Sequence, residues 1–352
     1  MKRITTRDIA KHIGMHYTTV AEALRNSPRI SEKTKKRVSE AAKELGYKPD
    51  PILAALNAYR CSKKIDRRSA TIAWINTHPT PEPTQGQRGI GWECYCGAKE
   101  RVEELGYKLE NFWLQNPRMT DKRATSILIA RGIKGVLIPP LDAGVQTLEF
   151  DWEKFSAVRL GHSLRATNLP SVTPDQVGNT ITLFKFLVRS GFKRIGLACP
   201  RWINQRVNFG FAAGFLGAHQ EYLPDHLPAP LFQEDLNEET KPKFLEWVRE
   251  YRFDALVLHQ NDDYESVLKE AGIRVPEDLS LAWTSLFSND PDRCGIHEDG
   301  KTIGRQGIDL IVAMLNRGQF GPSHPQTDLH VHGTLVLGKT LKMPHSGQIL
   351  GQ

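Results

Sequence analysis

Apolar residues in the first fifty positions recur three and four residues apart, the spacing of a helix that buries one face. The pattern predicts a first helix that begins after Thr5, with Asp8 completing its cap, and ends at Gly14. A second helix is predicted over about Tyr17–Arg25 and a third over Glu32–Leu45. Three short helices with a tight turn between the first two form a helix-turn-helix arrangement, whose second helix fits the major groove of DNA.

Beyond residue 70 the pattern changes to short apolar runs that alternate with amphipathic segments. The runs predict strands at Ala70–Ile75, Lys108–Leu114, Gly135–Ile138, Ala157–Leu160, Arg194–Cys199, Ala255–Leu258, Leu279–Trp283 and Asp328–Val336. The amphipathic segments predict helices at Gly91–Leu105, Asp121–Ala130, Gln176–Ser190, Phe209–Gln220, Thr240–Tyr251, Asp263–Ala271 and Ile303–Arg317. Such alternation is typical of α/β folds with parallel sheets. We therefore expect the core, residues 70–352, to have two lobes, approximately 70–168 with 298–327 and 169–297 with 328–340, and a ligand cleft between them.

Charge separates the same two parts of the chain. Residues 1–68 contain 17 Lys and Arg residues against 7 Asp and Glu residues, whereas the remainder contains 30 against 33. The whole positive excess therefore lies in the helical N-terminal part. A basic head on a nearly neutral body predicts a polyanion-binding domain attached to a soluble partner domain. A solvated basic tail is the simpler alternative, but a tail would lack the helical periodicity.

Several common classes of protein are disfavoured by what the sequence lacks. No run of eighteen apolar residues occurs, and no apolar stretch of signal-peptide length follows the N-terminus. Five irregularly spaced cysteines are typical of reduced thiols in the cytosol. Cys94-x-Cys96 and His330-x-His332 have partial metal-ligand spacing without a convincing second pair, and no complete catalytic motif is found. We expect a cytoplasmic protein that is not an enzyme and has no metal or cofactor.

A longer motif in the head is more specific. Its residues are Thr5-x-x-Asp8-Ile9-Ala10, Gly14, Thr19-Val20, Ser27-Pro28-x-Ile30-Ser31, Thr34 and Leu45-Gly46-Tyr47-x-Pro49. Together they resemble the head of the lactose-repressor/galactose-repressor (LacI/GalR) family of transcription regulators. The resemblance implies that residues 1–46 bind DNA, with Tyr17, Thr18 and Glu22 reading bases. It also implies phosphate contacts, which it assigns to Thr5, Thr19, Ser31 and Thr34.

Four positions in or next to the second helix depart from that family: His16, Ala21, Glu22 and Arg25. Glu22 stands where the family usually has Arg, so the usual guanine-reading fork is absent, and the carboxylate can instead accept from the amino group of cytosine. His16 stands where Ser is usual, and it either contacts a phosphate or only substitutes for the helix cap. We therefore expect an operator that differs from the family consensus.

The segment after the head has its own pattern. Asp50 and Pro51 suit the start of a helix, but one of only two to three turns is marginal without a partner. The resemblance implies a hinge helix at 47–60 that pairs with its dimer mate in the minor groove. There Leu56 would wedge open the central base step, flanked by Leu53 and Ala55. Packing of the leucines on the core is the alternative. Residues 61–69 are a linker by composition.

The core resembles the same family more loosely, and through it the periplasmic sugar-binding proteins. The matching pieces are Gly191-Phe192-x-Arg194-Ile195-Gly196, Arg206-x-x-x-Gly210-Phe211, Asn261-Asp262 and Gly272-Ile273-x-Val275-Pro276-x-Asp278-Leu279-Ser280. The resemblance implies an effector clamp at Arg206 and a ligand contact at Asp262, although a surface salt bridge would equally explain an Arg. The family's carboxylate after the Val-Pro-x-Asp run is absent here. Trp283 occupies that strand and either stacks on a sugar ring or fills the core.

These features predict a homodimeric transcription regulator, most often a repressor. It would bind a pseudo-palindromic operator in double-stranded DNA, because two-fold protein symmetry matches two-fold DNA symmetry. A small-molecule effector, sugar-like or a related metabolite, would bind between the lobes and alter the spacing of the hinges. Two alternatives stay open: a solute-binding or sugar-acting protein with an accessory DNA head, and a DNA binder with no effector.

Overall fold

The computed structural model describes most of the 352 residues. The described residues are 4–24, 30–47, 71–84, 89–142, 144–165, 167–226, 228, 230–233, 235–259, 263–286, 292–322 and 325–342. The predicted hinge helix at 47–60, apart from residue 47, and the linker at 61–69 lie outside them. No helix within these ranges is both long enough and apolar enough to span a bilayer.

The N-terminal part folds as the predicted three helices, α1 (Thr6–Ile13), α2 (Tyr17–Leu24) and α3 (Glu32–Glu44). Thr5 and Asp8 cap α1: the Thr5 side chain accepts the backbone N–H of Asp8, and the Asp8 side chain accepts the backbone N–H of Thr5. The helix ends at Gly14, whose φ of 66° is the left-handed conformation that glycine adopts without a steric penalty. A small core of seven buried residues holds the helices together: Ile9, Ala10, Val20, Ala23, Val38, Ala41 and Ala42.

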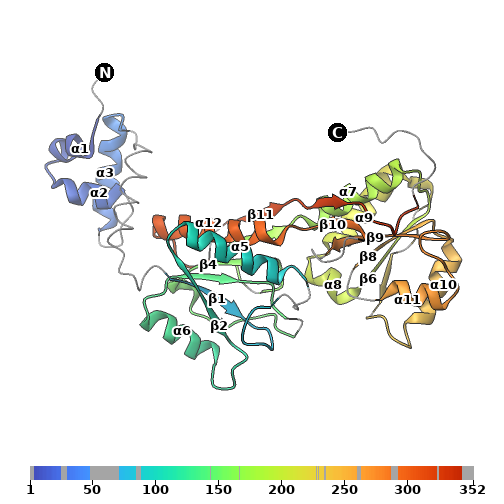
Figure 1. Ribbon diagram of the computed structural model, residues 1–352. Helices are drawn as coiled ribbons and strands as arrows, with labels where there is room; N and C mark the ends of the chain where they lie inside the picture. Colours follow the sequence, from blue (N-terminus) through green and yellow to red (C-terminus); the bar gives the residue numbers. More distant parts are fainter. Residues whose placement is uncertain are drawn as a thin grey trace.

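Two six-stranded sheets make up the described core (Figure 1). The first contains, in order, β11 (Asp328–Val331), β5 (Ser171–Pro174), β4 (Ser156–Leu160), β3 (Gly135–Ile138), β1 (Thr71–Asn76) and β2 (Lys108–Trp113), all parallel. The second contains β12 (Thr334–Val336), β10 (Cys294–His297), β9 (Ser280–Leu286), β8 (Ala255–Leu258), β6 (Ile195–Pro200) and β7 (Leu231–Gln233). Only β12 runs antiparallel to its neighbour among these described strands.

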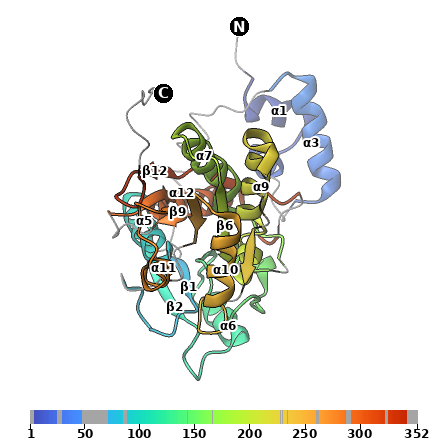
Figure 2. The same cartoon turned by 90° about the vertical axis from the view of Figure 1, so that its right-hand side faces the viewer.

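Helices cover both faces of each sheet, which explains why the central strands are apolar at nearly every position. On the first sheet, α5 (Gly91–Glu104) and α12 (Gly300–Arg317) pack on one face and α6 (Asp121–Ala130) on the other (Figure 1). On the second sheet, α7 (Gln176–Arg189) and α9 (Gly210–Tyr222) lie side by side on one face (Figure 2). The opposite face carries α10 (Lys241–Tyr251) and α11 (Tyr264–Glu270). The predicted α/β architecture is confirmed.

The chain passes between the two sheets three times, and this corrects the predicted lobe boundaries. The first crossing follows β5, the second follows β10 and the third lies between β11 and β12. Because β5 and β11 pair with each other in the first sheet, the crossings fall after residues 174 and 331 instead of 168 and 327. The predicted late strand at 328–336 is two strands, one in each sheet. The strands β5, β7 and β10 were not predicted, because each is short and includes polar residues or glycine and so gives no distinct apolar run.

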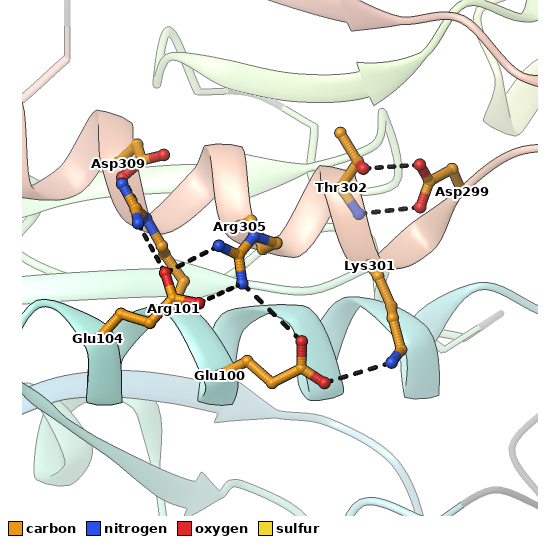
Figure 3. Close-up of polar contacts among 8 residues, drawn as sticks. All are labelled: Glu100, Arg101, Glu104, Asp299, Lys301, Thr302, Arg305 and Asp309. Carbon is orange, nitrogen blue, oxygen red and sulfur yellow. Dashed lines mark hydrogen bonds and ion pairs between the residues drawn. The ribbon is translucent and has the colours of Figure 1, made fainter.

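The contact between α5 and α12 is unusually close. Gly97 and Gly304 lie at this contact and leave no room for a side chain. A Cβ added to Gly97 would lie 2.0 Å from the carbonyl oxygen of Lys301, and one added to Gly304 would lie 2.0 Å from that of Cys94. Along the edge of this contact, Arg101 bonds Asp309 at 2.8 Å and Arg305 bonds Glu104 at 2.8 Å (Figure 3). Exposed ion pairs contribute little to stability. The apolar packing and the close approach of the helices at the two glycines therefore contribute most of the stability here.

We predict that Gly304→Ala will lower the free energy of unfolding by roughly 1–3 kcal/mol, because the new methyl group must displace backbone atoms of α5. Urea unfolding followed by circular dichroism measures the change. Gly217→Ala is the matched control, since this exposed helical glycine has no heavy atom within 4 Å of an added Cβ. It should gain about 0.5–1 kcal/mol from better helix propensity. Equal stability of the two variants would contradict the close contact.

Candidate DNA-reading surface and inter-lobe cleft

The polar row predicted on the second helix faces away from the core of the head. Tyr17 is 45% exposed and Thr18 is also exposed, while Thr19 and Glu22 are half-buried. Val20 and Ala23 form the opposite, buried face of α2. A short helix with one buried and one polar face can present side chains to base edges in the major groove.

Contacts within the head already orient two members of this row. The imidazole Nδ1 of His16 lies 2.8 Å from the hydroxyl oxygen of Thr18, and the His16 ring lies 4.6 Å from the ring of Tyr17. The guanidinium of Arg7 sits over the Tyr17 ring at 5.6 Å. His16 is thus adjacent to the row, and its phosphate contact stays a prediction. The contribution of Arg7 was not expected from the sequence, because a cation over a ring has no local motif.

The four predicted phosphate-contacting residues lie at helix N-termini. The Thr5 hydroxyl donates to Asp8 at 2.6 Å, and the Ser31 hydroxyl lies 2.9 Å from that of Thr34, whose N–H it also accepts. Thr19 belongs to the first turn of α2. Helix N-termini favour anions because their N–H groups point outward. Their contact with phosphate remains a prediction, and Leu53, Ala55 and Leu56 lie outside the described residues.

A cavity of about 430 Å³ lies between the lobes. Its wall on the first lobe includes Asn76, His78, Asp142 and His162; its wall on the second includes Gln176, Trp202, Arg206, Phe211 and His259. Many of these residues follow the carboxyl ends of parallel strands, where α/β folds bind ligands. The predicted cleft therefore has a counterpart in the structure, with polar groups on both walls.

Arg206 reaches across this cavity. It is the last residue of α8 (Arg201–Arg206), and its Nη2 donates to the carbonyl oxygen of Leu141 in the first lobe. Nearby, Nη2 of Arg165 donates to the carbonyl oxygen of Gln205 at 3.1 Å, again from one lobe to the other. Burial lowers the pKa of Arg206, although the adjacent Asp142 opposes that shift. The residue lies where the resemblance placed it, and its contact with an effector stays a prediction.

Two buried polar atoms on the cavity wall have no hydrogen-bond partner among the described residues. They are Oδ2 of Asp142 and Nδ1 of His259. Burial raises the pKa of Asp142 and lowers that of His259 to about 4, so the imidazole is neutral near pH 7. Unpaired buried polar atoms are costly, and a ligand with its own polar groups would satisfy them. Neither residue was singled out from the sequence, because single Asp and His residues after strands carry no motif.

Glu298 is a further polar residue on the wall that the sequence did not reveal. Its side chain is 5% exposed and is hydrogen-bonded to Ser285 of β9. Burial, together with the neighbouring Glu93, raises the pKa of this carboxyl to about 7. Among the described residues, no cluster of three or more His, Cys, Asp or Glu side chains has the arrangement of a metal site.

Two other residues, Trp283 and Asp262, were predicted to contact an effector. Trp283 is 1% exposed and packs in the core beneath α10 and α11, with the Arg293 guanidinium 4.8 Å from its ring. It does not line the cavity, so the structure does not support its predicted stacking on a ligand, and core filling accounts for the residue. Trp202, from α8, is the tryptophan of the second lobe that does line it. Asp262 lies outside the described residues.

Comparison with known proteins places this geometry among bacterial regulators. Residues 5–50 match the family described as "Bacterial regulatory proteins, lacI family". The chain is 22% identical to the HTH-type transcriptional repressor PurR of Pasteurella multocida, over 96% of this chain and 98% of that protein. It is also 22% identical to the PurR of Yersinia enterocolitica, over 94% and 95%.

Solved structures have the same fold over nearly the whole chain. The lac repressor dimer bound to operator and an anti-inducer superimposes with a TM-score of 0.55 at 19% identity, covering 96% of this chain and 99% of that one. The complex of the transcriptional regulator CelR with cellobiose gives a TM-score of 0.58 at 17% identity, covering 96% and 100%. Residues 5–50 thus match the lacI family of regulatory proteins, and nearly the whole chain is similar in sequence and fold to DNA-binding transcriptional repressors.

Proposed function

We propose that the protein is a cytoplasmic, homodimeric repressor that binds a pseudo-palindromic operator and responds to a small polar effector held between its lobes. The observation that carries the proposal is the cavity between the lobes, with Arg206 reaching across it and unpaired polar atoms on both walls. The full-length relatives are named as repressors, and one neighbour of the same fold is titled as a dimer bound to operator.

On the DNA side, Tyr17, Thr18 and Glu22 are proposed to read bases. The exposure of Tyr17 and Thr18, the position of Glu22 on the same side of α2 and the orienting contacts from His16 and Arg7 support this role. Rigid, preorganised side chains lose less conformational entropy on binding. We propose phosphate contacts at the helix N-termini that contain Thr5, Thr19, Ser31 and Thr34, which would fix the register of the head.

Residues 47–60 are proposed to form the hinge helix that links the head to the effector-binding core. Leu56, flanked by Leu53 and Ala55, would insert at the centre of the operator, where an apolar wedge kinks the duplex. A helix of this length is marginal alone, so its stability would depend on the distance to the same helix of the second subunit. Rotation of the lobes would change that distance and thereby couple effector to DNA.

The walls of the cavity favour a neutral ligand with several hydroxyl or amino groups. Asp142 offers an acceptor, the neutral His259 offers a further polar atom, and Trp74 and Trp202 add aromatic surface. Hydroxyl-rich rings with one apolar face match such a site. A carbohydrate is therefore our first candidate, in line with the cellobiose complex of a structural neighbour. A purine ring is the second, since relatives that span the chain carry the name PurR.

We predict that selection from a random DNA pool will recover a two-fold symmetric site with cytosine at the position that Glu22 faces. Glu22→Arg should exchange this base for guanine, because the guanidinium donates two hydrogen bonds to the guanine edge. Glu40→Arg, which makes the same charge change on the exposed side of α3, is the control and should keep the original site. Sequencing of the recovered pools gives the answer. If no pool is enriched, the regulator proposal fails; if the base is unchanged in Glu22→Arg, Glu22 does not read it.

We predict that Arg206→Ala will weaken effector binding by roughly 10–100-fold, because a charged donor to the ligand is lost. Calorimetry with a panel of mono- and disaccharides, purine bases and nucleosides identifies the ligand class for the wild-type protein first. Affinity for the selected operator without effector should stay the same. Arg189→Ala, on the exposed end of α7, is the control. Unaltered ligand affinity in Arg206→Ala would place the binding site elsewhere.

A further inference from the structure

Contacts between carboxylates and histidines occur where the chain crosses from one lobe to the other. Glu93 contacts His297 at the crossing between β10 and α12. Asp175 contacts His332 and His330 at the other two crossings. These pairs lie at the joints about which the lobes would rotate, and none of them belongs to the DNA-reading surface.

Glu93 makes two contacts that tie together different parts of the molecule. It lies in the first turn of α5, in the first lobe, and its side chain is 14% exposed. Oε1 is 3.2 Å from Nε2 of His297, the last residue of β10 in the second lobe. Oε2 accepts the N–H of Gly300 at 3.0 Å, at the first turn of α12. One carboxylate therefore holds the last strand residue before the crossing and the first helix residue after it.

Asp175 has the same position at the neighbouring crossing. It caps α7, and its Oδ1 accepts the N–H of Gly178 at 2.9 Å. Its Oδ2 lies 3.1 Å from Nδ1 of His332, between β11 and β12, and its Oδ1 lies 3.9 Å from Nδ1 of His330 on β11. In both places a helix-capping carboxylate faces a histidine across a joint. The pattern argues that these pairs belong to the hinge and are not isolated surface contacts.

We infer that Glu93 is a positioning residue for the lobes: its contact with His297 holds the observed arrangement of the hinge, and the contact weakens when His297 releases its proton. The charged groups that face His297 are Glu93 from α5 and, on the crossing itself, Glu298 and Asp299. Glu298 in turn faces Ser285 of β9, His297 and Glu93, and it also lines the effector cavity. The joint and the proposed binding site thus share a residue.

Two titrating groups, His297 and Glu298, decide whether a rise in pH strengthens or weakens the observed joint. Hydrogen bonding to Glu93 raises the pKa of His297, so this contact is complete below the ordinary histidine range and is lost as the pH rises through the raised value. Burial raises the pKa of Glu298 to about 7, so its burial costs least when it is protonated and the cost grows from pH 4.5 to 7. Both groups favour the observed joint at low pH and weaken it at high pH.

Hydrogen–deuterium exchange on the full-length protein tests this without an effector or DNA, so its outcome is separate from that of the proposed function. We expect protection of the segments 297–303 and 330–335 to fall between pH 6 and pH 8.5, after correction for intrinsic exchange, because the contact with Glu93 is lost as His297 releases its proton. The two segments include the N–H groups of Gly300 and Gly333, the latter bonded to Oδ1 of Asn179 at 2.8 Å.

Glu93→Gln and His297→Gln should each reduce this pH dependence to the part that Glu298 contributes. His297→Gln keeps the carboxylate that accepts from Gly300. Glu100→Gln is the matched control: Glu100 lies on the same helix and pairs with Lys301 at 3.2 Å, an ion pair that contains no histidine (Figure 3). It should behave like the wild-type protein. Circular dichroism at pH 6 verifies that each variant is folded.

Two results would overturn the inference. If protection of 330–335 is independent of pH while that of 297–303 changes, Glu93 merely caps α12 and does not position the lobes. If both segments respond to pH equally in the wild-type protein and in His297→Gln, some other group is responsible.

Discussion

Three segments of backbone join the two sheets, and they restrict how the lobes can move relative to each other. They leave the sheets at the ends of β5, β10 and β11, and the cavity is lined beside two of these ends, by Pro174 and Gln176 at and after the end of β5 and by Glu298 after β10. A ligand that contacts both walls therefore binds close to the joints. Only a small rotation of one lobe relative to the other is needed there to bring the two walls onto the ligand. Contacts that already cross the cavity, such as that of Arg206 with Leu141, show that the walls are within reach of one another. A ligand that binds more tightly when both walls contact it would favour an arrangement with a different angle between two otherwise rigid lobes.

The sequence predicted most of this architecture because its elements are long and strongly patterned. Apolar runs such as Thr71–Asn76 are buried at every position, and the helices that flank them repeat at 3.6 residues. The head was predicted almost to the residue, since Thr5, Asp8 and Gly14 are capping residues with a direct local mechanism. The errors fell on the crossings. There β5 and β11 pair over four residues each, and the sheet to which such a strand belongs depends on a partner more than 150 positions away.

The proposed effector site was harder to predict for a similar reason. Arg206 was found because a motif surrounds it, but Asp142, His259 and Glu298 meet only in the folded protein. Trp283 and Trp202 illustrate the limit. Trp283 lies within β9 and Trp202 follows β6 in α8. The tryptophan in the more suggestive motif, Trp283, is in the core, while Trp202 lines the cavity. Burial on one face of a strand is decided by the helices that cover it, and the strand's own residues do not encode which face meets ligand.

Differences from the usual family pattern occur at both ends of the proposed signalling path. Glu22 stands where the family usually has arginine, and the run 279–285 lacks the family's usual carboxylate, whereas a buried carboxyl, Glu298, lies at the next crossing. A carboxyl with a pKa of about 7 can donate or accept a hydrogen bond near neutral pH, whereas one with an ordinary pKa only accepts. The carboxyl of Glu298 also interacts electrostatically with His297, the adjacent residue of the joint. The proposed ligand site and the proposed positioning contact therefore include adjacent residues of one crossing, Glu298 and His297. On these proposals, a ligand that changes the protonation of Glu298 would also change the electrostatic interaction at the joint.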